Sequence, residues 1–331
     1  LANQILKEEN KIPLEFFQFY IWEGGSFISS ILTIPIFYLF GINGYALKLM
    51  PLILSLIIMI VLIKIVEELF NKKAMIIAGL FYIFSPVFYT LYAYNPLNVH
   101  ISSLLFILIG VYLSIIVSRD GKTIPTILLG LVLGFGLYIH DSFFLGILFC
   151  GIIILNSNKI KYFYDKLLFS FLIGFIPKLI MSINYESAPF NHIRELVLFD
   201  LMNIKTIGSM FISKFINFWT TSFPSALSLN MKNDYFFLSL LISSIFLLAI
   251  ILSLFRYKKD LKNIFFNIFK IKDKEKINPK AYFSLFALLF ICIYSISGFQ
   301  IFLAEYYLQY RYFIYLVPFM IIVLTDVLFR L

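Results

Sequence analysis

Long apolar runs, separated by short polar connections, dominate the pattern along this chain. Each run approaches the ~20 consecutive apolar residues that a helix needs to cross a bilayer. The runs are residues 45–66, 74–94, 97–117, 167–184, 236–255, 282–302 and 312–329. A shorter run at residues 27–40 contains Pro35 and favours an interfacial or half-inserted helix, with a short span as the alternative.

One further apolar run, residues 123–155, is broken only at His140 and Asp141. Each half has about 14 to 16 residues, too few to span a bilayer comfortably, which predicts a tight helical hairpin with these two residues at its tip. Together with the longer runs, this pattern predicts an all-α polytopic transmembrane bundle of about nine membrane helices plus interfacial helices.

Ionisable residues inside membrane segments are costly, so His140 and Asp141 are candidates for a functional site. The alternative is that the tip simply reaches lipid headgroups and water. Adjacent residues do not share a helix face, so the two are not interpreted as a catalytic dyad. Gly130, Gly134 and Gly136 would let the first half of the hairpin pack closely on a neighbouring helix.

Composition agrees with a membrane protein and excludes several function classes. Of the 331 residues, 61% are hydrophobic and 14% are charged, which excludes an ordinary soluble domain. The net charge of +9 comes mainly from Lys and Arg in the connections, a placement that orients membrane proteins and does not indicate nucleic-acid binding. The two cysteines lie within apolar runs and the three histidines lack ligand spacing, so neither a disulfide nor a zinc site is expected. Walker-type and GxGxxG loops are missing from the sequence, which disfavours nucleotide hydrolysis.

The charge pattern predicts a single domain whose connections alternate between the two sides of a membrane. Its expected parts are a first external loop with an interfacial helix at 1–44, core helices at 45–184, a second external loop with a surface helix at 185–235, and C-terminal helices at 236–331. If the complete protein begins in the cytoplasm, this arrangement requires one more span before Leu1, so the chain is interpreted as a fragment of a longer protein.

Residues 256–280 carry the strongest cytoplasmic signal, with nine Lys or Arg residues against three acidic ones. Within this segment, apolar residues at helical spacing are expected to lie opposite basic ones. The apolar positions are Leu261, Ile264, Phe265, Ile268 and Phe269, and the basic ones are Lys262 and Lys270. This spacing predicts an amphipathic helix on an anionic leaflet, and an ordinary charged loop is the alternative.

Three stretches follow one another in the order found in a known family. They are WEGGSFISSILTIPIFYLFGINGYALKLMP at 22–51, AMIIAGLFYIFSPVFYTLYAYNPLNVHISSLLFILIGVYL at 74–113, and QYRY at 309–312. Their order resembles that of GT-C glycosyltransferases of the protein-mannosyltransferase and aminoarabinose-transferase type. The hairpin at 123–155 resembles a helix pair of related members. The resemblance implies a multi-pass protein of the cell membrane.

That family transfers a sugar from a polyprenyl-phosphate donor to a protein, lipid or glycan acceptor on the non-cytoplasmic face. The resemblance implies that the catalytic acid, an Asp or Asp–Glu pair after the first membrane helix, lies upstream of Leu1. Within this chain, Asp141 and Glu23 are the weak candidates for a catalytic carboxylate. Asn98 stands where many members have Asp, which puts a second carboxylate at that turn in doubt.

Four residues on the expected outer face are candidates for binding the donor phosphate or sugar. They are Lys48, Arg311, His100 and His140. The alternative for Lys48 and Arg311 is anchoring at the membrane interface. For His100 the alternative is a hydrated helix end, and for Glu23 it is a solvated loop. No metal ligand is assigned, and the resemblance leaves a divalent metal open as a cofactor.

Two other function classes remain as alternatives. A transporter or flippase for lipid-linked saccharides would carry polar groups at the bilayer midplane and an internal repeat. The sequence shows no such repeat, and its polar residues gather at helix ends. A non-catalytic membrane scaffold is the reading that would follow if the catalytic acid were missing from the complete protein.

Overall fold

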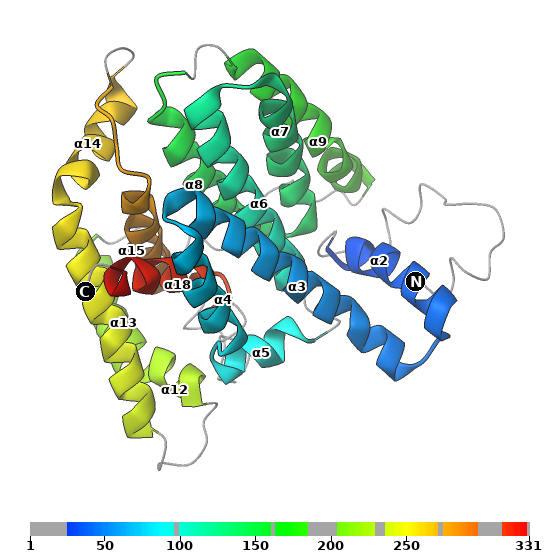
Figure 1. Cartoon of the computed structure of the whole chain (residues 1–331), viewed down its shortest axis with the longest axis horizontal. Coiled ribbons are helices and arrows are strands. Elements are labelled where there is room, and N and C mark those ends of the chain that lie inside the picture. Colours follow the sequence, from blue (N-terminus) through cyan, green and yellow to red (C-terminus); the bar gives the residue numbers. More distant parts are fainter. Residues whose placement is uncertain are drawn as a thin grey trace. The chain divides into compact units, whose positions relative to one another are not determined.

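The computed structural model of the chain describes residues 25–95, 99–159, 163–184, 204–228, 236–270, 274–296 and 313–329. These residues form helices joined by short connections, with no strand among them (Figure 1). The predicted all-α fold class is therefore confirmed.

Three helices within the described ranges are long and apolar enough to cross a membrane. They are α3 (Gly44–Leu69), α6 (Val99–Asp120) and α13 (Phe236–Arg256). Shorter apolar helices are α2 (Gly25–Phe40), α7 (Thr123–Ile139), α8 (Phe144–Leu155), α15 (Lys280–Ile296) and α18 (Leu316–Leu328). A further helix, α9 (Tyr164–Asn184), carries Lys178 among apolar residues.

The predicted span at residues 74–94 is two helices, α4 (Lys72–Ile83) and α5 (Val87–Ala93). The interruption falls at Ser85 and Pro86. Proline has no N–H to donate and pushes the preceding residue away from helical geometry, so it ends α4 and allows a new helix to begin after it. The expectation of one continuous helix was wrong at this point.

The chain divides into two compact units. The first comprises Leu1–Val61, Tyr92–Asn191 and Lys272–Lys274, and the second comprises Leu62–Leu91, His192–Ile271 and Glu275–Leu331. In the first unit, α6 packs on both α7 and α8, while α7 packs most extensively on α9 (Figure 1). The prediction of a single domain over residues 1–331 stays a prediction.

Glycines bring α7 and α9 into close contact, as the sequence predicted. A Cβ atom on Gly130 would lie 2.6 Å from the backbone oxygen of Leu167 on α9, and one on Gly134 would lie 2.6 Å from the backbone nitrogen of Phe175. From the opposite side, a Cβ atom on Gly174 of α9 would lie 2.5 Å from the backbone oxygen of Leu131. The two backbones approach so closely that only hydrogen fits between them.

Alanine at Gly134 is therefore expected to force α7 away from α9 and to lower the free energy of unfolding by about 1–3 kcal/mol, the usual cost of overpacking. Gly151 on α8 is the matched control, because a Cβ atom there meets nothing within 4 Å. Gly151→Ala should leave stability unchanged or raise it slightly through helix propensity. Thermal unfolding of both variants in the same detergent measures the difference, and equal melting temperatures would contradict this packing.

The predicted tight hairpin is wrong in one respect, because α7 and α8 make little contact with each other. Instead α8 lies against α6, where a Cβ atom on Gly110 would be 3.1 Å from the sulfur of Cys150. Between α7 and α8, His140 has an extended backbone (φ −164°, ψ 141°) and a 3-10 turn follows at Asp141–Phe143. This irregular connection redirects the chain, so that both halves of the run can pack on α6.

The second unit is built around α18, which packs on α4, α13 and α15. Rings from separate helices fill its interior, with Phe313 in edge contact with Phe88, Phe218 and Phe223. The predicted surface helix of the 185–235 loop corresponds to α11 (Ile204–Asn217), which continues through a π-helical segment (Phe218–Ser222) into α12 (Phe223–Ser228). Phe218 and Trp219 are buried, which anchors this segment in the unit. The rest of that loop lies outside the described residues.

Candidate functional site

A group of buried polar side chains lies at one end of the helices of the first unit. We call it the His–Asp–Lys cluster, and it consists of His100, His140, Asp141 and Lys178, all buried. Three elements supply it: the start of α6, the connection between α7 and α8, and α9. The close α7–α9 packing places Lys178 beside that connection.

The backbone around His140 positions its imidazole. His140 ends α7, and its Nδ1 atom accepts a hydrogen bond of 2.9 Å from the backbone N–H of Ser142. Because Nδ1 is the acceptor, the proton of the neutral ring is assigned to Nε2. The ring of His140 lies against that of His100, with 4.3 Å between the ring centroids and 48° between the planes. The fold thus brings together two imidazoles that are forty positions apart in the sequence.

Asp141 points to a different partner from that of His140. The ammonium of Lys178 donates a hydrogen bond of 2.8 Å to Asp141 Oδ1, and the two side chains are only 5% and 8% exposed. The prediction that adjacent His140 and Asp141 do not act as a dyad agrees with this geometry. The alternative, in which the tip simply reaches headgroups and water, does not hold for Asp141, because its carboxylate is buried against the Lys178 ammonium. A charge buried inside a bundle is stabilised by pairing with an opposite charge, whereas one facing lipid extends toward water.

Two serines of α6 add hydrogen-bonding capacity near the cluster. Within the described part of the chain, the buried Oγ atoms of Ser102 and Ser103 have no hydrogen-bond partner. Ser103 lies one turn after His100 on α6. One turn further along the helix, the side chain of Ile107 packs against Gly146 of α8. Adjacent residues do not share a helix face, so of these two serines only Ser103, three residues after His100, lies on the same side of α6 as His100.

The other sequence-predicted residues are not part of this cluster as far as the structure describes them. Lys48 is exposed in the first turns of α3. Glu23 and Arg311 lie outside the described residues, as does Asn98. Sequence reasoning singled out His100, His140 and Asp141 but did not predict their association with Lys178. The sequence did contain a signal for Lys178, since this residue is a lone charge in the interior of an apolar helix.

No group of three or more His, Cys, Asp or Glu residues that could hold a metal ion occurs among the residues the structure describes. The cluster instead offers hydrogen-bond donors, which suit a ligand that accepts hydrogen bonds. A lysine ammonium and imidazole N–H groups are donors of the kind that bind phosphate oxygens. In a site shielded from water, such donors also stabilise charge that develops on a leaving group.

Residues 28–181 match the family model described as dolichyl-phosphate-mannose-protein mannosyltransferase. This match confirms the resemblance to GT-C glycosyltransferases for that part of the chain, and it supports a membrane glycosyltransferase of the GT-C type. The matched segment contains every member of the His–Asp–Lys cluster. No curated protein and no solved structure matches the chain.

Proposed function

We propose that this chain transfers a sugar from a polyprenyl-phosphate donor to an acceptor on the non-cytoplasmic face of a membrane. The observation that carries the proposal is the family match over residues 28–181, the segment that holds the buried cluster. Apolar helices around that segment suit a donor with a long hydrocarbon chain, since the chain can lie between helices. The identity of the donor, the identity of the acceptor and the side of the membrane on which transfer occurs are all parts of this proposal.

The distribution of charge supports the non-cytoplasmic location of the cluster. Arg119, Lys122, Lys159 and Lys166 gather at the end of the first unit where α6 stops and α7 begins: Lys159 donates to the backbone oxygen of Arg119, and Lys166 donates to Thr123 Oγ1. Basic connections of this kind stay in the cytoplasm. His100 is at the opposite end of α6, about 28 Å away at 1.5 Å per residue, close to the thickness of a bilayer core.

The cluster fits the binding of the departing phosphate better than the activation of the acceptor. Asp141 is already paired with Lys178, so its carboxylate fixes the ammonium and is poorly placed to take a proton from a hydroxyl group. Lys178 and the imidazole N–H groups would hold the phosphate as its charge develops. We therefore propose that Asp141 positions Lys178, and that a carboxylate other than Asp141 activates the acceptor.

Transfer of radiolabelled sugar tests this proposal, with polyprenyl-phosphate mannose as the first donor and the glucose and aminoarabinose forms as the next. The protein is assayed in membranes that contain candidate acceptors. His100→Phe retains a ring against His140 but removes both nitrogens, and it is expected to reduce transfer by roughly 10²-fold. Lys122→Gln, at the opposite end of α7, is the control and should transfer normally. Equal rates for the two variants would remove the cluster from the proposed site.

The arrangement does not favour the transport alternative. A transporter requires its polar groups near the bilayer midplane. The cluster instead lies where α6 begins and α7 ends, at one end of the first unit. A transporter would also deliver the donor to the other leaflet with its sugar–phosphate bond intact, so the same labelled donor distinguishes the two activities.

A further inference from the structure

The helix α14 (Lys258–Phe269) lies where a membrane span is expected to end. It follows α13 after the single residue Tyr257, and α13 is one of the helices able to cross a membrane (Figure 1). Tyr257 has φ −98° and ψ 18°, so the helix is bent at this residue. If α13 crosses the bilayer, α14 must begin at the boundary between lipid and water.

One face of α14 is fixed to the rest of the second unit. The carboxylate of Asp260 accepts a hydrogen bond of 2.9 Å from the backbone N–H of Asn278. Asn267 donates to the backbone oxygen of Glu275 at 2.8 Å and accepts from its N–H at 3.1 Å. Between these two positions, Ile264 is fully buried. Residues 260, 264 and 267 share a helix face, and this face is turned toward the connection that leads to α15.

The opposite face of α14 carries both apolar and basic side chains. Phe265, Phe266 and Phe269 are 55%, 56% and 85% exposed, and Lys258 and Lys262 are exposed beside them. The Lys262 ammonium lies 5.7 Å from the centre of the Phe266 ring. The predicted separation of apolar and basic faces was therefore wrong, because Ile264 points inward while the phenylalanines share the outward face with lysine. Three neighbouring exposed phenylalanine rings indicate a surface that meets an apolar partner.

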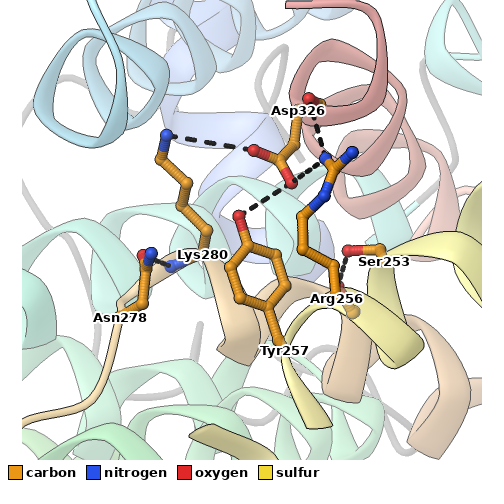
Figure 2. A network of polar contacts seen from close by, with 7 residues as sticks. Ser253, Arg256, Tyr257, Asn278, Lys280 and Asp326 are labelled. Atoms are coloured by element: carbon orange, nitrogen blue, oxygen red, sulfur yellow. Dashed lines mark hydrogen bonds and ion pairs between the residues drawn. The ribbon is translucent and has the colours of Figure 1, made fainter. Parts of the chain in front are cut away.

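A buried carboxylate holds the bend that sets the direction of this face. Asp326 of α18 accepts a 2.8 Å hydrogen bond from the Tyr257 hydroxyl (Figure 2). The same carboxylate lies 3.3 Å from Arg256 Nη1 and 3.9 Å from the ammonium of Lys280. Figure 2 shows these three side chains converging on Asp326 from the end of α13 and the start of α15. These contacts with Asp326 therefore fix the direction in which the outward face of α14 points.

We propose that this face of α14 docks into an anionic lipid surface. Phe265, Phe266 and Phe269 would enter the boundary between headgroups and acyl chains, and Lys258 and Lys262 would contact lipid phosphates. Two features select lipid over a protein partner: the junction with a membrane span, and the excess of nine basic over three acidic residues in segment 256–280. This docking is independent of sugar transfer.

Photocrosslinking at position 269 tests the proposal in the complete chain. A benzophenone amino acid replaces Phe269, and the protein is reconstituted in vesicles of phosphatidylcholine with a minor share of phosphatidylglycerol. After illumination, mass spectrometry identifies the adducts. We expect phospholipid adducts in which the anionic lipid is enriched about fivefold over its share in the vesicle, the effect of one basic side chain near an anionic surface.

Removal of the basic side chains provides a second test of the lipid-docking proposal. Lys258→Gln with Lys262→Gln should return the adducts to the composition of the vesicle. Lys72→Gln with Lys73→Gln, which removes two exposed charges from the first turn of α4, is the matched control and should keep the enrichment. Adducts formed mainly with protein would overturn the proposal in favour of a protein interface. Lipid adducts without anionic enrichment, or enrichment that survives loss of both lysines, would also overturn it.

Discussion

Asp141→Asn should lower the free energy of unfolding by about 3–5 kcal/mol, the cost of removing one partner from a buried ion pair. The ammonium of Lys178 would remain inside the first unit with an amide as its nearest partner in place of the carboxylate at 2.8 Å. Thermal unfolding in nanodiscs measures this loss. Asp120→Asn is the matched control, because the Arg119–Asp120 pair is 55% and 24% exposed and screened by water, so its loss should leave the melting temperature nearly unchanged.

A double variant separates the ion pair from other effects at this position. Asp141→Asn combined with Lys178→Met removes both charges, so no ammonium is left buried, and most of the lost stability should return. Sugar transfer should not return with it, because the proposed phosphate-binding ammonium is missing. A double variant as unstable as Asp141→Asn alone would contradict the ion pair. Recovery of full transfer would contradict the role proposed for Lys178.

Asp326→Asn should lower the free energy of unfolding by about 3 kcal/mol, toward the lower end of the range for buried ion pairs. The carboxylate is 3% exposed, but its partners Arg256 and Lys280 are 31% and 17% exposed and can regain water. Tyr257 loses a charged acceptor, so the bend before α14 should loosen. We expect faster hydrogen exchange of the α14 amides as well as a lower melting temperature.

Tyr257→Phe is a milder change in the same network and is compared with Asp326→Asn. It removes a single hydrogen bond of 2.8 Å to a charged group and should cost about 1.5–3 kcal/mol at most. Because Arg256 and Lys280 still hold Asp326, exchange in α14 should rise less than in Asp326→Asn. Unchanged exchange in both variants would show that the network does not set the position of α14.

The periodic part of the fold could be predicted from the sequence, and its interruptions could be predicted only in part. Apolar runs of sufficient length identified α3, α6 and α13, because length and hydropathy are local properties. Pro86 divides α4 from α5, although the apolar run on both sides of it predicts a single span. The glycines of α7 predicted close packing, but the sequence could not identify α9 as the partner, which depends on the fold.

The candidate site could likewise be predicted only as far as local features of the sequence reveal it. His140 and Asp141 were visible as the only polar break in an apolar run, and this local signal located the cluster. Their partners come from distant segments, and nothing in the spacing of His100 or Lys178 indicates that they meet there. The balance between burial and exposure of a charge depends on which helices surround it. That balance could not be predicted from the sequence for Lys178, which is paired inside the bundle.

We propose that the protein breaks the bond between sugar and phosphate in a polyprenyl-phosphate donor. The most direct measurement is the fate of a donor that carries a tritiated sugar and a radioactive phosphate, incubated with the complete protein in sealed vesicles that contain acceptor. We expect the two labels to separate, with the sugar in the acceptor fraction and the phosphate in free polyprenyl phosphate. Labels that stay together in every fraction, whichever leaflet they reach, would contradict it.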